Sequence, residues 1–81
     1  MTRVTLYGRP ECHLCEEARA AVAAARSRRE FDLEEIDISL DPRLDRRYGE
    51  RIPVVAIDGE DVLELRFGAE ELVGRLDRVS P

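Results

Sequence analysis

The chain has 81 residues, of which 43% are apolar and 38% charged, and its formal net charge is −5. This composition is typical of one soluble globular domain, which we expect to span residues 1–81, and it excludes a disordered chain. The acidic balance and the lack of a long apolar run exclude general nucleic-acid binding and a membrane span. We therefore expect neither a nucleic-acid nor a membrane partner.

The first residues lead directly into a strand pattern, without the basic segment and apolar core of a secretory signal. We therefore expect a cytoplasmic protein, and we expect it to act as a monomer. In a reducing compartment, two cysteines serve catalysis or metal binding more often than a permanent disulfide.

The first predicted strand covers Val4–Tyr7, which is rich in β-branched and apolar residues. Small and apolar residues then recur at helical spacing from Leu14 to Ala25, so a helix follows. The pair Cys12 and Cys15 stands at the junction, spaced C-x-x-C. Cys12 is thus predicted at the start of the helix, where free N–H groups and the helix dipole stabilise a thiolate.

Apolar and acidic residues alternate over Phe31–Ile38, which predicts a second strand, parallel to the first because a helix connects the two. A short helix follows, with Asp41 suited to its N-cap and Pro42 to its first turn, and it ends near Tyr48.

Two apolar runs, Ile52–Ile57 and Val62–Leu65, flank Asp58-Gly59, which is the usual signal of a β-hairpin. Glu70–Val79 carries apolar residues at helical spacing and is predicted to be the last helix. The predicted order is therefore β-α-β-(short α)-β-β-α.

This order resembles the glutaredoxin-type form of the thioredoxin fold. The specific matches are Cys12-His13-Leu14-Cys15 after the first strand and Ile52-Pro53-Val54 at the third, and the resemblance covers almost the whole chain. It implies an α/β fold with a four-stranded mixed sheet and helices on both faces. It also implies a cis bond before Pro53, which would face Cys12, with the backbone of Ile52 positioned to pair with an extended substrate peptide.

The resemblance implies a thiol-disulfide oxidoreductase in which Cys12 attacks and Cys15 resolves the mixed disulfide. Its substrate would be a disulfide-containing protein or a small-thiol mixed disulfide. No bound cofactor is expected, and electrons would come from a low-molecular-weight thiol or a thioredoxin-type system. No metal ligand is predicted, since zinc and iron-sulfur sites usually need four ligands and the chain has no second cysteine pair.

Two other functions remain open. In the first, the protein is a cluster carrier: two subunits would hold an iron-sulfur cluster between their Cys12 sulfurs, together with external thiols, as some glutaredoxins do. Alternatively, the chain is a redox-inactive thioredoxin-fold binding module with idle cysteines.

Two residues beside the cysteines are further candidates for substrate binding. Arg9 lies where glutaredoxins commonly carry a lysine that assists the thiolate and binds a carboxylate of glutathione; the alternative is a solvated surface side chain. His13 is predicted to tune the thiolate or pass protons, or simply to be exposed beside the site.

The chain also departs from ordinary glutaredoxins. Arg51 stands where they have a threonine, and the Gly-Gly plus Asp element that holds the glutamyl end of glutathione is missing. Gly68 and the start of the last helix offer N–H groups to a carboxylate instead. The stretch Cys12–Ala18 is similar to an uncharacterised glutaredoxin-like branch, and a reductant other than glutathione is expected.

Overall fold

The computed structural model describes residues 2–79, which form one four-stranded sheet and the helices that pack on it. The elements are β1 (Arg3–Gly8), α1 (His13–Arg26), β2 (Asp32–Asp37), the short 3-10 helix η1 (Ile38–Leu40), α2 (Pro42–Tyr48), β3 (Val54–Ile57), β4 (Glu60–Glu64) and α3 (Ala69–Val79). Apart from η1, this is the predicted order.

The strands lie in the order β2-β1-β3-β4. β1 pairs in parallel with β2 and antiparallel with β3, and β3 pairs antiparallel with β4. The sheet is therefore mixed, as predicted. The turn between β3 and β4 has positive φ at both Asp58 (50°) and Gly59 (89°), a backbone shape that matches the twist of a two-residue hairpin.

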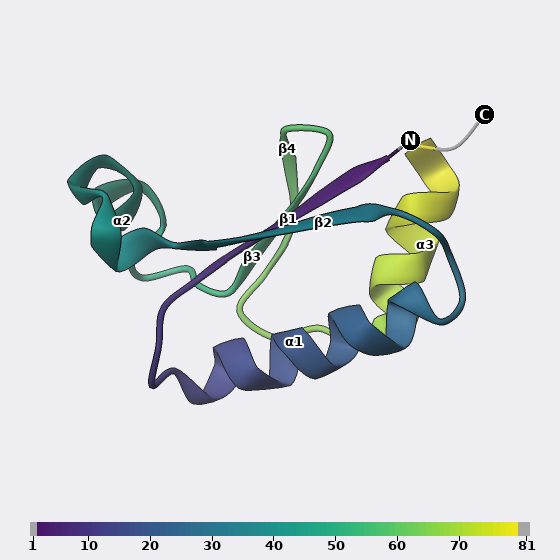
Figure 1. Cartoon of the computed structure of the whole chain (residues 1–81), viewed down its shortest axis with the longest axis horizontal. Coiled ribbons are helices and arrows are strands. Elements are labelled where there is room, and N and C mark those ends of the chain that lie inside the picture. Colours follow the sequence, from purple (N-terminus) through teal and green to yellow (C-terminus); the bar gives the residue numbers. More distant parts are fainter. Residues whose placement is uncertain (1, 80–81) are drawn as a thin grey trace.

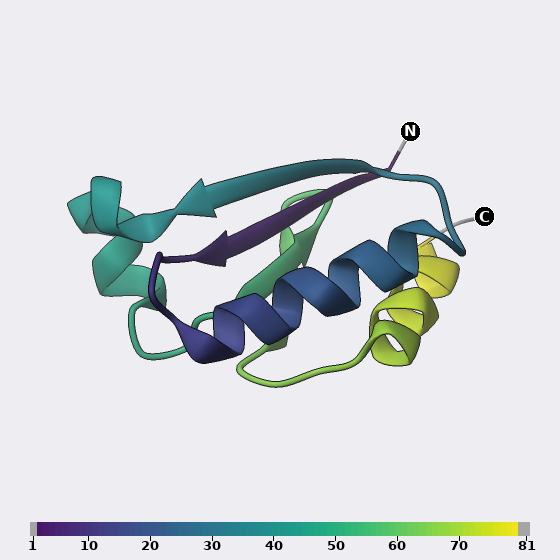
Figure 2. The same cartoon turned by 60° about the horizontal axis from the view of Figure 1, so that its bottom comes forward.

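Alternation along the strands places helices on both faces of the sheet. One buried cluster combines side chains of α1 and α3 with Val4 and Leu6 of β1. The next residue of β1, Tyr7, belongs to a second cluster with Tyr48 of α2. Because successive strand residues point to opposite faces, α2 covers the face opposite α1 and α3. Figures 1 and 2 show α1 and α3 together on one side, with α2 at the far end of the sheet from α3.

Local capping explains where several elements begin and end. Asp41 accepts the N–H of Arg43 at 2.9 Å and Pro42 occupies the first turn of α2, as predicted. The second strand is shorter than predicted, because Asp37 Oδ1 accepts the N–H of Ser39 at 2.9 Å and turns the chain into η1. Ile38 therefore leaves the strand and is fully buried in the second cluster.

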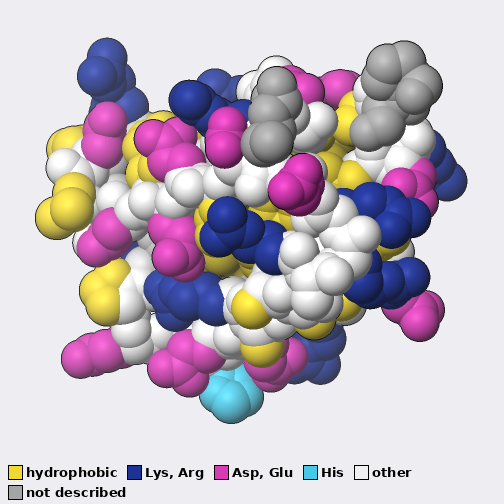
Figure 3. Space-filling view, turned by 45° about the vertical axis from the view of Figure 1, so that its right-hand side comes forward, with side chains coloured by type: hydrophobic (Ala, Val, Ile, Leu, Met, Phe, Trp, Pro, Cys, Tyr) yellow, Lys and Arg dark blue, Asp and Glu magenta, His cyan; other side chains and the backbone are white. Residues whose placement is uncertain are grey.

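The surface carries charges of both signs, which are interspersed over the face in Figure 3. Some of these charges connect elements: Arg29, just after α1, pairs with Asp77 of α3 at 2.8 Å. Within residues 2–79, every helix is too short or too polar to cross a membrane.

Candidate active site

Cys12 is the N-cap of α1. Its backbone is extended, with φ −113° and ψ 113°, and its Sγ accepts the backbone N–H of Cys15 at 3.2 Å. The sulfur thus takes the place that a serine or aspartate oxygen usually fills at a helix start. This N–H is one of the free donors in the first turn of α1, and the side chain of Cys12 is half-buried.

Cys15 lies one turn into α1 and is only 1% exposed. Burial raises the pKa of its thiol to about 11, and a hydrogen bond with Cys12 adds to this rise. The backbone N–H of Arg9 and the charge of Arg19 act in the opposite direction. Because its pKa is raised above the ordinary value for a thiol, Cys15 is protonated at neutral pH.

Gly8 allows Cys15 to approach the end of β1. A Cβ added at Gly8 would lie 3.0 Å from the Cys15 sulfur, closer than side-chain carbons normally come. The two cysteines therefore differ, with a half-exposed sulfur at the helix start and a buried sulfur against the sheet.

Arg9 and His13 both lie beside the cysteines, but each has an acidic partner. Arg9 Nη2 pairs with Asp45 Oδ1 of α2 at 2.7 Å, so its guanidinium ties the loop after β1 to α2. The side chain of His13 is 84% exposed, and its Nε2 lies 3.2 Å from Glu17 Oε2, one helical turn away. A substrate that uses either residue would meet these carboxylates.

The Ile52–Pro53 bond is cis, as the resemblance implied. Ile52 is 9% exposed and belongs to the buried cluster of Cys15, against which Cys12 packs, so the segment before β3 adjoins the cysteine pair. Pro53 is fully buried.

Gly68 lies before α3, and its N–H already donates to Glu71 Oε1 at 3.1 Å. A carboxylate ligand at this N–H would have to displace Glu71. Nearby, Leu65 has a left-handed backbone, with φ 66°, and its N–H donates to the carbonyl oxygen of Pro53 at 2.8 Å. The side chain of Leu65 is 44% exposed.

Sequence reasoning overlooked Tyr48, which supports the site from α2. Its ring stacks on Tyr7 with the centroids 4.4 Å apart, and its hydroxyl donates to Asp61 at 3.1 Å. Burial, with help from Asp61, raises the pKa of the Tyr48 hydroxyl to about 12. The spacing of Leu44 and Tyr48, one turn apart, marks the inner face of α2 and is the signal that would have found it.

Among the described residues, no group of three or more histidine, cysteine, aspartate or glutamate side chains is arranged to hold a metal ion. A cluster between two copies of the chain would need ligands from both of them.

Comparison with known proteins places this geometry in a family. Residues 3–78 match the family described as Glutaredoxin-like domain (DUF836). Target protein XcR50 from X. campestris is 36% identical, with a TM-score of 0.83 over 95% of this chain and 99% of that one. Protein Ne2328 from Nitrosomonas europaea is 28% identical, with a TM-score of 0.78 over 91% and 89% of the two chains.

A more distant match shows the fold alone. Thioredoxin-2 of the malaria parasite is 10% identical, with a TM-score of 0.76 over 96% of this chain and 82% of that one. No curated protein matches the sequence significantly. The predicted thioredoxin-like α/β fold is thus confirmed.

Proposed function

Because the chain belongs to the Glutaredoxin-like domain (DUF836) family, we propose that it is a thiol-disulfide oxidoreductase that reduces or exchanges disulfides through Cys12 and Cys15. The observation that carries this proposal is the position of the Cys12 sulfur. It caps α1, accepts the N–H of Cys15 at 3.2 Å, and lies beside a second, buried sulfur.

In the first step, the Cys12 thiolate attacks one sulfur of a substrate disulfide. A bond forms between Cys12 and that sulfur, and the other substrate sulfur leaves with the electron pair as a thiolate. Cys15 then loses its proton and attacks Cys12, which releases the second substrate thiolate and leaves a disulfide between the two cysteines. The two substrate thiolates take up protons, and the substrate has gained two electrons.

The partner in this proposal is a disulfide-containing protein or a small-thiol mixed disulfide. The ladder between β1 and β3 begins at Tyr7 and Val54, so the backbone of Ile52 lies just outside it. An extended substrate segment would pair there beside Cys12. We propose that the protein works as a monomer in the cytoplasm and binds no cofactor.

Turnover of a small disulfide tests the proposal. Catalysis by the purified protein with an external thiol supports it, whereas absence of turnover with every donor points to an idle binding module. A brown, dimeric protein with labile iron and sulfide, but without turnover, would indicate a cluster carrier.

We further predict that glutathione is a poor donor. The one N–H of Gly68 is taken by Glu71, and the glutamyl-binding element of glutaredoxins is missing. Loss of one charge-assisted hydrogen bond corresponds to about a tenfold slower reaction. Reduction of the oxidised protein by glutathione should therefore be about tenfold slower, or more, than that of an ordinary dithiol glutaredoxin measured alongside.

A small uncharged dithiol, which needs no such contact, is the matched donor control and should reduce both proteins at similar rates. Equal rates with glutathione would show that other groups hold its glutamyl end.

A further inference from the structure

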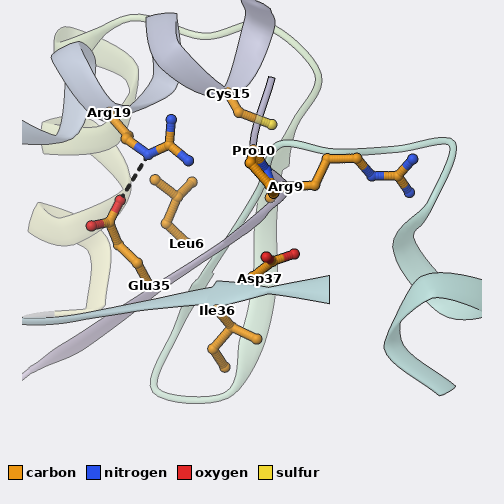
Figure 4. Close-up of a pocket in the computed structure, with 9 residues that line it drawn as sticks. Leu6, Arg9, Pro10, Cys15, Arg19, Glu35, Ile36 and Asp37 are labelled. Carbon is orange, nitrogen blue, oxygen red and sulfur yellow. Dashed lines mark hydrogen bonds and ion pairs between the residues drawn. The ribbon is translucent and has the colours of Figure 1, made fainter. Parts of the chain in front are cut away.

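A pocket of about 250 Å³ lies between α1 and β2, and the buried Cys15 lines it while Cys12 does not. Its polar lining also includes Arg19 of α1 and Glu35 of β2. Figure 4 shows Cys15 and Arg19 leaving the same helix and pointing into this space, with Glu35 below them. The resolving sulfur therefore has surroundings that the attacking sulfur does not share.

Arg19 is held in place at the pocket. It follows Cys15 by four residues, so both side chains lie on the same face of α1. Its Nε donates to Glu35 Oε1 at 3.1 Å. Both side chains are about half exposed, at 45% and 51%, so the pair is hydrated and contributes little to stability.

The charge of Arg19 acts on a sulfur that is difficult to ionise. Burial is the main reason that the pKa of Cys15 is high. The charge of Arg19 lowers this pKa, by less than the backbone N–H of Arg9 does. In a mixed disulfide Cys12 carries no charge, so its coulombic contribution to the raised pKa of Cys15 is absent. The titratable or charged groups around Cys15 are Tyr7 of β1, Arg9 in the following loop, Cys12 at the N-cap of α1, Arg19 of α1, Glu35 and Asp37 of β2, and Tyr48 of α2.

We propose that Arg19, held by Glu35, promotes ionisation of Cys15 for the resolving step, and that the proton leaves to solvent through this pocket. The inference rests on the proposed function and concerns its second step only. Arg19 acts through its charge on Cys15 and touches no substrate, and Glu35 is a positioning residue.

The step balances without a further reactant. Cys15 gives up its proton to solvent, and its thiolate attacks the Cys12 sulfur. The bond between Cys12 and the substrate sulfur breaks, and that sulfur leaves with the electron pair and is later protonated.

Reaction with dithionitrobenzoate separates the two cysteines in time, because each cleavage releases one coloured thiolate. The fast phase reports attack by Cys12, and the slow phase reports attack by Cys15 on the mixed disulfide. We would compare wild type, Arg19→Gln and Arg19→Lys across neutral and alkaline pH. Arg28→Gln removes the same charge beyond the end of α1 and is the matched control.

Arg19→Gln should slow the second phase at pH values below its plateau, because the fraction of Cys15 thiolate falls by more than the nucleophilicity of the more basic sulfur rises. The midpoint of its pH profile should move to higher pH. The first phase should not change, Arg19→Lys should restore the wild-type profile, and Arg28→Gln should match wild type.

Several outcomes would overturn the proposal: an unchanged second phase, equal slowing at all pH values, or equal slowing of both phases. Glu35→Gln keeps an oxygen for Arg19 and should not slow resolution; if it does, Glu35 takes the proton and Arg19 only orients it. If wild type shows no second phase at all, the proposed function fails, and this inference with it.

Discussion

Replacing Cys12 by serine is expected to lower disulfide turnover by about 1000-fold or more, because a serine hydroxyl is not ionised at neutral pH and the attacking group is lost. The fold should persist, since a serine oxygen at the N-cap accepts the N–H of Cys15 as the sulfur does. Circular dichroism checks the fold, and a steady-state assay with a small disulfide measures the loss.

Cys12→Ser should form no mixed disulfide with the substrate, whereas Cys15→Ser should form one that persists. Cys12 still attacks, but nothing resolves the mixed disulfide, so a stable adduct accumulates. With dithionitrobenzoate, the variant should release one coloured thiolate and retain the other, as intact-protein mass would show. The variant Cys12→Ser/Cys15→Ser is the control and should release none.

The reverse pattern, with an adduct on Cys12→Ser and none on Cys15→Ser, would mean that Cys15 is the attacking cysteine and Cys12 the resolving one. That result would contradict the difference in burial between the half-exposed Cys12 and the buried Cys15.

Leu72→Ala is expected to lower the free energy of unfolding by about 2–5 kcal/mol, the usual cost of truncating a buried leucine. Leu72 is fully buried in the cluster that joins α3 to α1 and the sheet. A domain of this size has a total stability of about 4–12 kcal/mol at typical values per residue, so the loss is a large part of it. Urea unfolding followed by circular dichroism measures the change.

Leu40→Ala is the matched control, because Leu40 is 82% exposed. Its stability should stay within about 0.5 kcal/mol of wild type. Equal stability of Leu72→Ala and wild type would mean that α3 does not pack as described.

Features set by neighbouring residues were predictable from the sequence. Asp41-Pro42 fixes the start of α2 through a cap and a preset φ, and Asp58-Gly59 fixes the hairpin through positive φ. The burial of Cys15 follows from its place on the same helical face as Ala18 and Val22. The cis bond at Pro53 followed only from the family resemblance, because a lone proline favours trans.

Features set by distant residues were not predictable. Arg19 and Glu35 are sixteen positions apart, and Tyr48 and Asp61 thirteen, so only the folded chain brings each pair together. Leu65 adopts a left-handed backbone that leucine rarely takes. Its N–H donates a hydrogen bond to the carbonyl oxygen of Pro53, just before β3. The residues next to Leu65 in the sequence do not predict such a contact.

The most direct test of the account is whether Cys12 and Cys15 form a reversible disulfide with each other. They are one helical turn apart, within reach of such a bond. The protein would be oxidised mildly, alkylated under denaturing conditions and weighed, before and after treatment with a dithiol. We predict a mass lower by two hydrogens, no alkyl group after oxidation, and alkylation of both cysteines after reduction. Alkylation of both cysteines in every oxidised molecule would contradict the dithiol mechanism.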